Sequence, residues 1–336
     1  MTAHISRVAP GIRSVAPVLE SWVIVLLIVS ASFAADLLGE PPLRIHPVVL
    51  IGRMASFLDR KLRFTDRLRA AGVLLWVLCV VVPVALSAFL LRVLYSLGFV
   101  LVWFLVSVFL LKSSFTLFSM DRHVKPILES LRSGEIDDAR RHLQLIVRRP
   151  TADLDTGLIC SAVVESVAEG LVDGTCSPLL FFSVLGVLGA LGYRAVNTLD
   201  GMVGYTSPEY LEIGWFSAKA DTAANYLTAR LVGILTVIAA YILGLNARGS
   251  WVTFRRDHSR TRSRNAGCPM AAFAGALNVR LEKRSEYVIG EGYGYPGIRE
   301  VEASLKLMKL VTLLFTALVA ITFSLLMAGR YLRWWL

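Results

Sequence analysis

Six apolar stretches, each about long enough to cross a bilayer, dominate the sequence. They lie at roughly 18–38, 71–91, 97–118, 176–196, 226–245 and 307–328. A helix needs about 20 predominantly apolar residues to span the hydrocarbon core. The chain is 55% hydrophobic and only 18% charged, with a mean hydropathy of +0.62, which lies outside the range of soluble domains. The sequence therefore predicts an all-α, polytopic integral membrane protein with about four to six membrane helices.

Most of the Lys and Arg residues lie in three loops, at 39–70, 119–175 and 246–306. The connections between them hold few cations, such as Arg92 and Lys219. Lys and Arg collect in cytoplasmic loops. We therefore expect a protein of the cell (inner) membrane whose helical basic loops lie in the cytoplasm and whose N-terminus lies outside. No repeat or linker divides the chain, so residues 1–336 form a single membrane domain. No basic run is interleaved with stacking aromatics, so nucleic acid is not an expected partner.

Three carboxylates, Glu165, Glu169 and Asp173, are spaced four apart in ESVAEGLVDG, directly before an apolar stretch. On a helix they fall within an arc of about 80° on one face. Like charges at this spacing repel unless a cation or a basic partner offsets them. Magnesium takes oxygen ligands and commonly binds carboxylates together with phosphates. This pattern has two interpretations that it favours about equally. One is a Mg²⁺ site, and the other is a solvated helix face paired with neighbouring arginines.

A second polar group lies in YRAVNTLDGMVGY, where Arg194, Asn197 and Asp200 recur every three residues at the end of an apolar segment. Ionisable groups this close to the hydrocarbon are costly and are functional candidates. The alternative is an interfacial arginine that extends to the headgroups. Gly201 and Gly204 allow a close approach of the backbone to a ligand.

Asp221 shares a helix face with Asn225 and Thr228 where the chain enters the next apolar stretch. An ordinary polar cap of a membrane helix would have the same pattern. Asp221 is therefore the weakest of the candidate site residues, and its expected role is that of a base.

The last basic loop combines a run of arginines, among them Arg256, with the turn Asn265–Gly267–Pro269. Proline suits the first position of a helix, and the helix that follows is too short to cross a bilayer. A helix N-terminus behind arginines can bind phosphate, although these arginines could also serve only to set the topology.

The topology leaves one question open, because a spanning 176–196 segment would put the acids inside and Asp200 outside. Segments 176–196 and 226–245 could instead form a non-spanning pair, with Gly186, Gly189 and Gly192 in a broken helix. The charge rule is satisfied either way.

These motifs together resemble one family. Their order and spacing are similar to those of the CobD/CbiB family, adenosylcobinamide-phosphate synthase. The stretches that carry the resemblance are DLLGEPP with HPVVLIGR, ESVAEGLVDG with SPLL, YRAVNTLDGMVGY and NAGCPMAAFAGALNVRLE. The likeness covers roughly residues 30–320, and four ordered motifs are far more specific than one. Gly170, Arg148, Thr222 and Cys268 depart from the family's usual residues.

The resemblance implies an ATP-dependent ligase that joins adenosylcobyric acid to aminopropanol or its phosphate, with Mg²⁺. Its partners would be a corrinoid, an aminoalcohol and the lipid bilayer, and assembly with other membrane-bound corrinoid enzymes is a further expectation. Under this hypothesis the metal site uses Glu165, Glu169, Asp173 and Asp200, and Arg194, Asn197, Arg256 and Asn265 bind ATP or its phosphates. Glu165, Glu169, Asp200 and Asp221 are the catalytic candidates.

Two other classes of function compete with a ligase. A transporter for an anionic substrate would also carry charge at the membrane, but transporters commonly show internal repeats, and none is evident here. A membrane assembly protein would not need the acids.

Overall fold

The computed structural model describes residues 10–205 and 207–328, and the side chains of 23–205 and 207–321. Most of this part of the chain is helical. The helices are α1 (Pro10–Leu38), α2 (Pro47–Leu62), α3 (Leu68–Ser96), α4 (Val100–Lys112), α5 (Phe118–Arg132), α6 (Ile136–Gln144), α7 (Thr156–Leu171), the π-helical turn η1 (Val172–Cys176), α8 (Ser177–Val203), α9 (Trp215–Ile242), α10 (Ala247–Asp257), α11 (Arg264–Leu277) and α12 (Ile298–Ala328). A two-stranded antiparallel hairpin, β1 (Leu281–Lys283) and β2 (Tyr287–Ile289), lies between α11 and α12.

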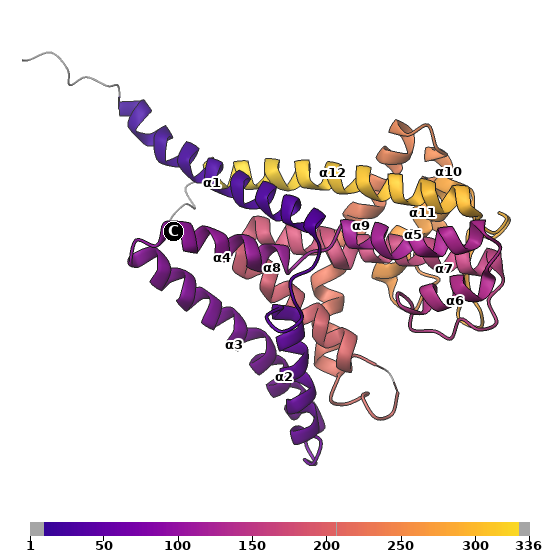
Figure 1. The fold of residues 1–336 in the computed structure, drawn as a ribbon, viewed down its shortest axis with the longest axis horizontal. Coiled ribbons are helices and arrows are strands. Elements are labelled where there is room, and N and C mark those ends of the chain that lie inside the picture. Colours follow the sequence, from indigo (N-terminus) through magenta and orange to yellow (C-terminus); the bar gives the residue numbers. More distant parts are fainter. Residues whose placement is uncertain (1–9, 206, 329–336) are drawn as a thin grey trace, which may run out of the picture.

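The helices separate into an apolar end and a compact head. In Figure 1, α1, α3 and α4 extend toward the left, whereas α5, α6, α7, α10 and α11 gather at the right, and α12 runs along the top between them. Four described helical segments are long and apolar enough to cross a membrane: α3, the stretch Thr156–Val203, α9 and the described part of α12. Val23–Leu38 and α4 are apolar but shorter. The predicted all-α polytopic fold is confirmed.

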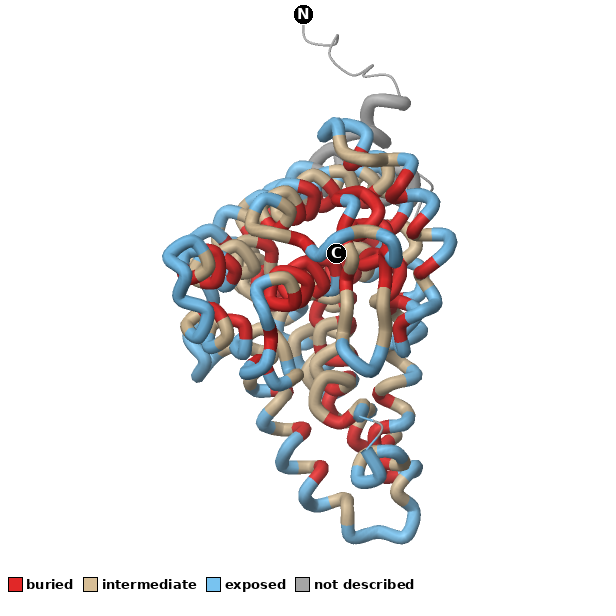
Figure 2. The backbone as a smooth tube through the Cα atoms, turned by 90° about the vertical axis from the view of Figure 1, so that its right-hand side faces the viewer, coloured by how far each residue is buried: buried red, intermediate tan, exposed pale blue. Residues whose placement is uncertain are grey.

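Apolar burial is concentrated in the head. In Figure 2, buried residues gather in the wide upper part, whereas most residues of the narrow lower part are intermediate or exposed. The largest apolar cluster joins α5, α6, α7, α9, α11, α12 and the hairpin. Helix α6 begins after Gly134, whose φ of +76° suits glycine. The exposed large apolar residues of α3 and α4, such as Leu86, Phe89 and Leu101, have the composition expected of a lipid-facing surface.

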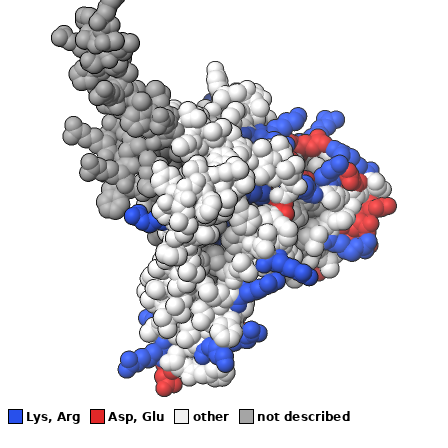
Figure 3. Space-filling view, turned by 60° about the vertical axis from the view of Figure 1, so that its left-hand side comes forward, with Lys and Arg blue, Asp and Glu red and all other residues white. Residues whose placement is uncertain are grey.

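Charged side chains avoid part of the surface. In Figure 3 the Lys, Arg, Asp and Glu side chains gather mainly at the lower tip and along the right-hand side of the face shown, and a broad uncharged area lies between them. The lower tip is formed by the turn between α2 and α3. There Arg63 binds Asp59 and Glu209, and Arg69 binds Glu212, so the turn holds the loop between α8 and α9.

The stretch 97–118, predicted as one membrane helix, is helical over only part of its length, in α4. Helix α4 has only 13 residues, or about 20 Å, which is less than the hydrocarbon core. The helix ends at Lys112, whose ammonium group belongs to a buried ion network. In addition, the hydroxyls of Ser113 and Ser114 donate back to the carbonyls of Phe109 and Leu110.

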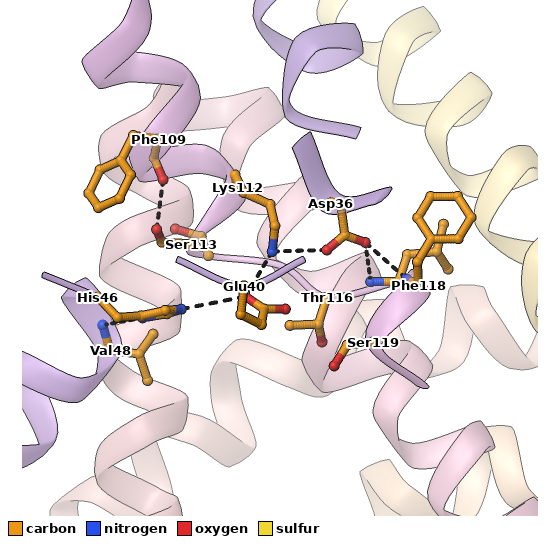
Figure 4. A network of polar contacts seen from close by, with 12 residues as sticks. Asp36, Glu40, His46, Val48, Phe109, Lys112, Ser113, Thr116, Phe118 and Ser119 are labelled. Carbon is orange, nitrogen blue, oxygen red and sulfur yellow. Dashed lines mark hydrogen bonds and ion pairs between the residues drawn. The ribbon is translucent and has the colours of Figure 1, made fainter. Parts of the chain in front are cut away.

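The ion network centres on the ammonium group of Lys112, which lies 2.9 Å from Asp36 Oδ1 and 2.8 Å from Glu40 Oε2 (Figure 4). Asp36 is fully buried and Lys112 nearly so. Asp36 Oδ2 accepts hydrogen bonds from the backbone N–H groups of Leu117 and Phe118, at 3.0 and 2.9 Å. It therefore satisfies donors at the start of α5, where the helix dipole also favours a negative charge.

This network also supports the π-helical turn. The backbone N–H of Thr116 donates to the Gly174 carbonyl at 2.7 Å, and the Thr175 hydroxyl donates to the Thr116 carbonyl at 2.9 Å. The Lys112–Asp36 pair fixes the chain from Ser113 to Phe118, and that chain in turn holds η1. Asp173 lies in η1, so the network positions one of the predicted site residues.

Replacing Lys112 with Met should destabilise the protein strongly. The substitution leaves the Asp36 carboxylate buried without its cation, and loss of one partner of a buried ion pair costs about 3–5 kcal/mol. Thermal unfolding in detergent measures the change. The matched control is Lys125→Met, because Lys125 is exposed on α5 and its ion pair with Glu129 is loose, at 3.7 Å. Equal melting temperatures for the two variants would contradict the role given to the network.

Glu40 should make the stability of the network depend on pH. Burial alone raises the pKa of Glu40, but hydrogen bonds from His46 and Lys112 and the charge of Lys112 outweigh burial and lower this pKa to about 2. Because the pKa is depressed on folding, the contribution of Glu40 is fully present above pH 4.5 and is lost as the pH falls toward 2.

The measurement is the melting temperature of the wild type and of Glu40→Gln between pH 7 and pH 2. We expect the wild type to be more stable at pH 6 and the difference to vanish at the acid end. A difference that stays constant over the range would show that ionised Glu40 does not contribute.

Candidate functional site

Helix α8 is broken at Gly186. Its φ of 66° and ψ of −158° are not helical, and an L-residue side chain is strained in this region. The two arms of the break lie against each other, because a Cβ placed on Gly189 would be 2.4 Å from the Phe181 carbonyl oxygen. The rings of Phe181 and Tyr193 stack across the arms, with centroids 5.2 Å apart. The chain therefore enters along one arm and returns along the other.

This reversal brings the two ends of the segment together. In a straight helix, residues 173 and 194 would be about 32 Å apart. Here Tyr193 Oη and Arg194 Nη1 each lie 3.5 Å from the Asp173 carbonyl oxygen. The structure has the break at Gly186 that the non-spanning arrangement of 176–196 requires, and Asp173 and Asp200 line one cavity. The other segment, 226–245, is not broken, because α9 is continuous from Trp215 to Ile242.

The site is a cavity of about 110 Å³ where η1, α7, α8, α9 and α11 meet. Its lining includes five residues predicted from sequence, and these are Glu169, Asp173, Asp200, Asp221 and Asn265. Val172, Asn225, Ser263 and Ala266 complete the lining. Glu169 is exposed at this cavity, and the three aspartates are partly buried. Four carboxylates from three helices and the π-helical turn therefore face one small space.

Asp221 is held rigidly by two amide groups. Asn197 Nδ2 donates to its Oδ1 at 3.2 Å, and Asn225 Nδ2 donates to its Oδ2 at 3.1 Å. The amide oxygens are also satisfied, since Arg194 donates to Asn197 and the hydroxyls of Ser177 and Tyr193 donate to Asn225. Asn197 and Arg194 thus support the cavity through Asp221. Both oxygens of Asp221 are acceptors in this chain, which suits an ionised carboxylate.

The other three carboxylates of the cavity have no such donors. Within the described part of the chain, the side chains of Glu169, Asp173 and Asp200 accept no hydrogen bond and form no ion pair within 4 Å. Two nearby glycines leave room for charged groups. A Cβ on Gly204 would lie 2.0 Å from Asp200 Oδ1, and a Cβ on Gly201 would lie 3.2 Å from Arg148 Nη2. The predicted close approach at both glycines accommodates side chains of the protein itself.

The beginning of α11 forms one wall of the cavity. The helix starts at Arg264, and its N-cap is Ser263, whose hydroxyl accepts from the Ala266 N–H at 3.4 Å. Asn265 Oδ1 accepts from Arg230 at 2.8 Å, and Asn265 Nδ2 donates to the Thr222 carbonyl at 2.8 Å. The prediction that Pro269 occupies the first helical position was wrong, because a capping serine starts the helix earlier and Pro269 lies inside it.

Glu165 does not line the cavity. Its carboxylate accepts hydrogen bonds from the Ser161 hydroxyl at 2.7 Å, the Tyr287 hydroxyl at 2.7 Å and Arg149 at 3.2 Å. Burial and the charge of Glu165 raise the pKa of Tyr287, so its hydroxyl stays a donor. Of the three acids expected to converge, Glu169 and Asp173 line the cavity. Glu165 does not, because its carboxylate is engaged by Ser161, Tyr287 and Arg149.

Arg256 is not part of the cavity wall either. Its guanidinium binds both carboxylate oxygens of Asp257 at 2.8 Å. Asp257 is fully buried and also accepts from the Gly290 N–H. Burial alone raises the pKa of Asp257, but these donors outweigh it and lower the pKa. The structure thus uses Arg256 to fix the turn after β2, where Gly290 has a positive φ.

The cavity fits a magnesium ion in its ligand chemistry. Carboxylates without other donors are the oxygen ligands that Mg²⁺ prefers, and Mg²⁺ usually takes one or two of them and completes its shell with water and phosphate. One or two of Glu169, Asp173 and Asp200 would hold it. Among the residues with described side chains, no three His, Cys, Asp or Glu groups are close enough to enclose a metal alone.

Several contributors to this site were not among the candidates from sequence. They are Ser263 in the wall, Arg230 behind Asn265, and Arg149 and Tyr287 around Glu165. Tyr287 is more than 100 residues from Glu165 in the chain, and no local pattern indicates such a contact. Ser263 carried a usable signal, because a serine before a helix is a common N-cap.

Comparison with known proteins gives a consistent family match. The family model described as CobD/Cbib protein matches residues 28–325. A "Probable cobalamin biosynthesis protein CobD" of Thermoplasma volcanium is 39% identical over 305 residues, covering 90% of this chain and 99% of the relative. A "Cobalamin biosynthesis protein CobD" of Geobacter metallireducens is 40% identical over 262 residues, covering 77% and 82%. A protein of the same description from Listeria monocytogenes is 38% identical over 269 residues, covering 78% and 84%. No solved structure matches the chain.

Replacing Gly186 with Ala should disrupt the cavity from a distance. The strained backbone costs on the order of 1–3 kcal/mol in an L-residue, so we expect a lower melting temperature in detergent. Gly192→Ala is the matched control in the same helix, since a Cβ there would meet only Val84 Cγ2, at an ordinary 3.5 Å. If Gly186→Ala is as stable as Gly192→Ala, the chain does not reverse at Gly186 as described.

Proposed function

The chain belongs to the CobD/CbiB family of cobalamin biosynthesis proteins, and on this premise we propose that it is an ATP-dependent carbon–nitrogen ligase. In this proposal it joins a carboxylate of adenosylcobyric acid to the amine of aminopropanol or aminopropanol phosphate, giving adenosylcobinamide or its phosphate. Mg²⁺ is the metal, and ATP is a substrate.

One observation carries the proposal. Three carboxylates without hydrogen-bond donors face a cavity whose wall includes the capped N-terminus of α11. Acids of this kind suit a divalent ion, and free N–H groups at a helix start suit a phosphate. Amide formation with ATP needs both kinds of group at one place. A site with only one of them would not favour this reaction over simple ion binding.

The chemistry assigns a task to each group. A carboxylate is a poor electrophile, so an oxygen of the corrinoid carboxylate would attack the γ-phosphorus of ATP and release ADP. The amine nitrogen would then attack the carbonyl carbon of this acyl phosphate, releasing phosphate and one proton. Bound Mg²⁺ would neutralise the charge of the phosphates. Asp221, fixed by Asn197 and Asn225, would accept the proton of the amine, which must attack in its neutral form.

The size of the cavity limits what it encloses. A volume of about 110 Å³ holds an ion and small reacting groups, whereas whole ligands occupy pockets of about 300–1,000 Å³. The corrin ring and the nucleoside would therefore lie outside it. The sequence contains no GxxxxGK[ST] loop, so ATP would be bound without the usual phosphate loop.

The proposal includes a location for the site. We place the protein in the inner membrane with its N-terminus outside and the cavity facing the cytoplasm, where ATP is available. This placement follows from the basic loops. Assembly with other membrane-bound corrinoid enzymes is part of the proposal, because they would supply and consume its corrinoids.

The Asp200→Asn substitution should reduce ligation by at least about 100-fold, in line with the loss of a charged group from a catalytic site. The assay incubates purified protein with adenosylcobyric acid, aminopropanol phosphate, ATP and Mg²⁺ and detects the amide by mass. Because Asp200 would hold Mg²⁺, the Mg²⁺ concentration for half-maximal rate should also rise. Asp138→Asn is the control, since Asp138 pairs with Arg141 on the surface of α6. Full activity of Asp200→Asn at low Mg²⁺ would exclude this metal site.

A further inference from the structure

Arg148 lies at the edge of the acidic cavity, in the loop between α6 and α7. Its Nη2 is 3.2 Å from the position that a Cβ of Gly201 would occupy, directly next to Asp200 in the chain. The guanidinium carbon lies 5.4 Å from the centroid of the Tyr205 ring. Arg148 is also a favourable electrostatic partner of both Glu169 and Asp200, two of the carboxylates in the cavity lining. The side chain is therefore held beside the cavity from two sides.

The guanidinium is held there without using its hydrogen-bond donors. Among residues 23–205 and 207–321, Arg148 makes no hydrogen bond and no ion pair within 4 Å. Its neighbours in space and sequence differ in this respect. Arg149 donates to Glu165, and Arg194 donates to Asn197. An arginine has five N–H donors in a fixed plane, and those of Arg148 are available to a ligand.

The surroundings select the chemistry of that ligand. Arginine binds carboxylate or phosphate with two parallel hydrogen bonds. A free anion at this cavity would be repelled by Glu169, Asp173 and Asp200, and a cation at the edge offsets that repulsion. Gly201 contributes because any larger side chain would meet the guanidinium in its present position. Arg148 is also exposed, so a ligand can reach it from solvent.

We propose that Arg148 binds a phosphoryl group of a substrate at the edge of the carboxylate cavity. This inference rests on the proposed ligase function and adds a specificity residue to it. Two substrates could supply the group, namely the phosphate of aminopropanol phosphate and the phosphates of ATP. In the first case Arg148 would let the protein prefer the phosphorylated amine over the free aminoalcohol. In the second case it would bind the nucleotide regardless of the amine.

The experiment measures equilibrium binding of three separate probes to the full-length protein in detergent with Mg²⁺. The probes are aminopropanol phosphate, aminopropanol and ATP, and the proteins are the wild type, Arg148→Ala, Arg148→Lys and the control Arg141→Ala. Arg141 is an exposed arginine on α6 that pairs with Asp138. Melting temperatures check that all variants fold. Because Arg148 is exposed and lacks hydrogen-bonded partners among the described residues, they should match.

We expect Arg148→Ala to weaken binding of one phosphorylated probe about 10- to 100-fold, the usual effect of a charge-assisted hydrogen bond. The affinity of Arg148→Lys for that probe should lie between those of the wild type and Arg148→Ala, since lysine keeps the charge but not the planar pair of donors. Aminopropanol binding and the Arg141→Ala variant should be unchanged. A loss for aminopropanol phosphate or for ATP supports the proposal and identifies the source of the phosphate.

The proposal is overturned if Arg148→Ala binds both phosphorylated probes within about threefold of the wild type, a change too small for a lost charge-assisted hydrogen bond. This result would leave the ligase function standing, provided that the wild type forms the amide in the turnover assay. Absence of amide with intact, Arg148-dependent phosphate binding would instead count against the ligase function alone. The two failures are therefore distinguishable.

Discussion

The reversal of the chain at Gly186 is the constraint on which the site depends. An L-residue side chain is strained at a φ of 66° and a ψ of −158°, and the next turn requires Gly189, where any Cβ would meet the Phe181 carbonyl. With a straight helix, Asp173 and Asp200 would lie at opposite ends of a rod. With the break, Asp173, Asp200 and Asp221 line one cavity. A broken helix at membrane depth is tolerated where protein surrounds it, and Gly186 itself is buried.

Support for the cavity comes from parts of the protein that contribute nothing to its lining. The Lys112 pair with Asp36 fixes the chain that holds η1, and the Glu165 network links α7 to the hairpin through Tyr287. In both networks a buried charged group is paired with its partners, and removal of one partner would strongly destabilise the protein. By contrast, the side-chain carboxylates of Glu169, Asp173 and Asp200 accept no hydrogen bond from the described residues. The protein thus satisfies the charges that position the site and leaves the charges of the site itself available.

Much of this arrangement could be predicted from sequence, for reasons that differ between residues. Hydropathy predicted the polytopic helical fold because lipid imposes a minimum length on every span. It overestimated the length of the helix at 97–118, because the ion network that ends α4 depends on Asp36 and Glu40, which are distant in sequence. Glu169 and Asp173 could be found from their spacing, whereas the role of Arg148 could not, because its contacts with Gly201 and Tyr205 arise only from folding. Glu165 and Arg256 looked equivalent to their neighbours in sequence, and only the contacts of their side chains separate them from the cavity.

The most direct test of a single site on one side of the membrane is the accessibility of two introduced cysteines. Ser133→Cys lies in the loop after α5, and Ser207→Cys lies in the loop between α8 and α9, and both positions are exposed. The four native cysteines are buried, so the unmodified chain serves as the background control. With a membrane-impermeant maleimide, a reversal at Gly186 predicts that both cysteines are labelled in inverted vesicles and neither in intact cells. Labelling of the two positions from opposite sides would contradict the account.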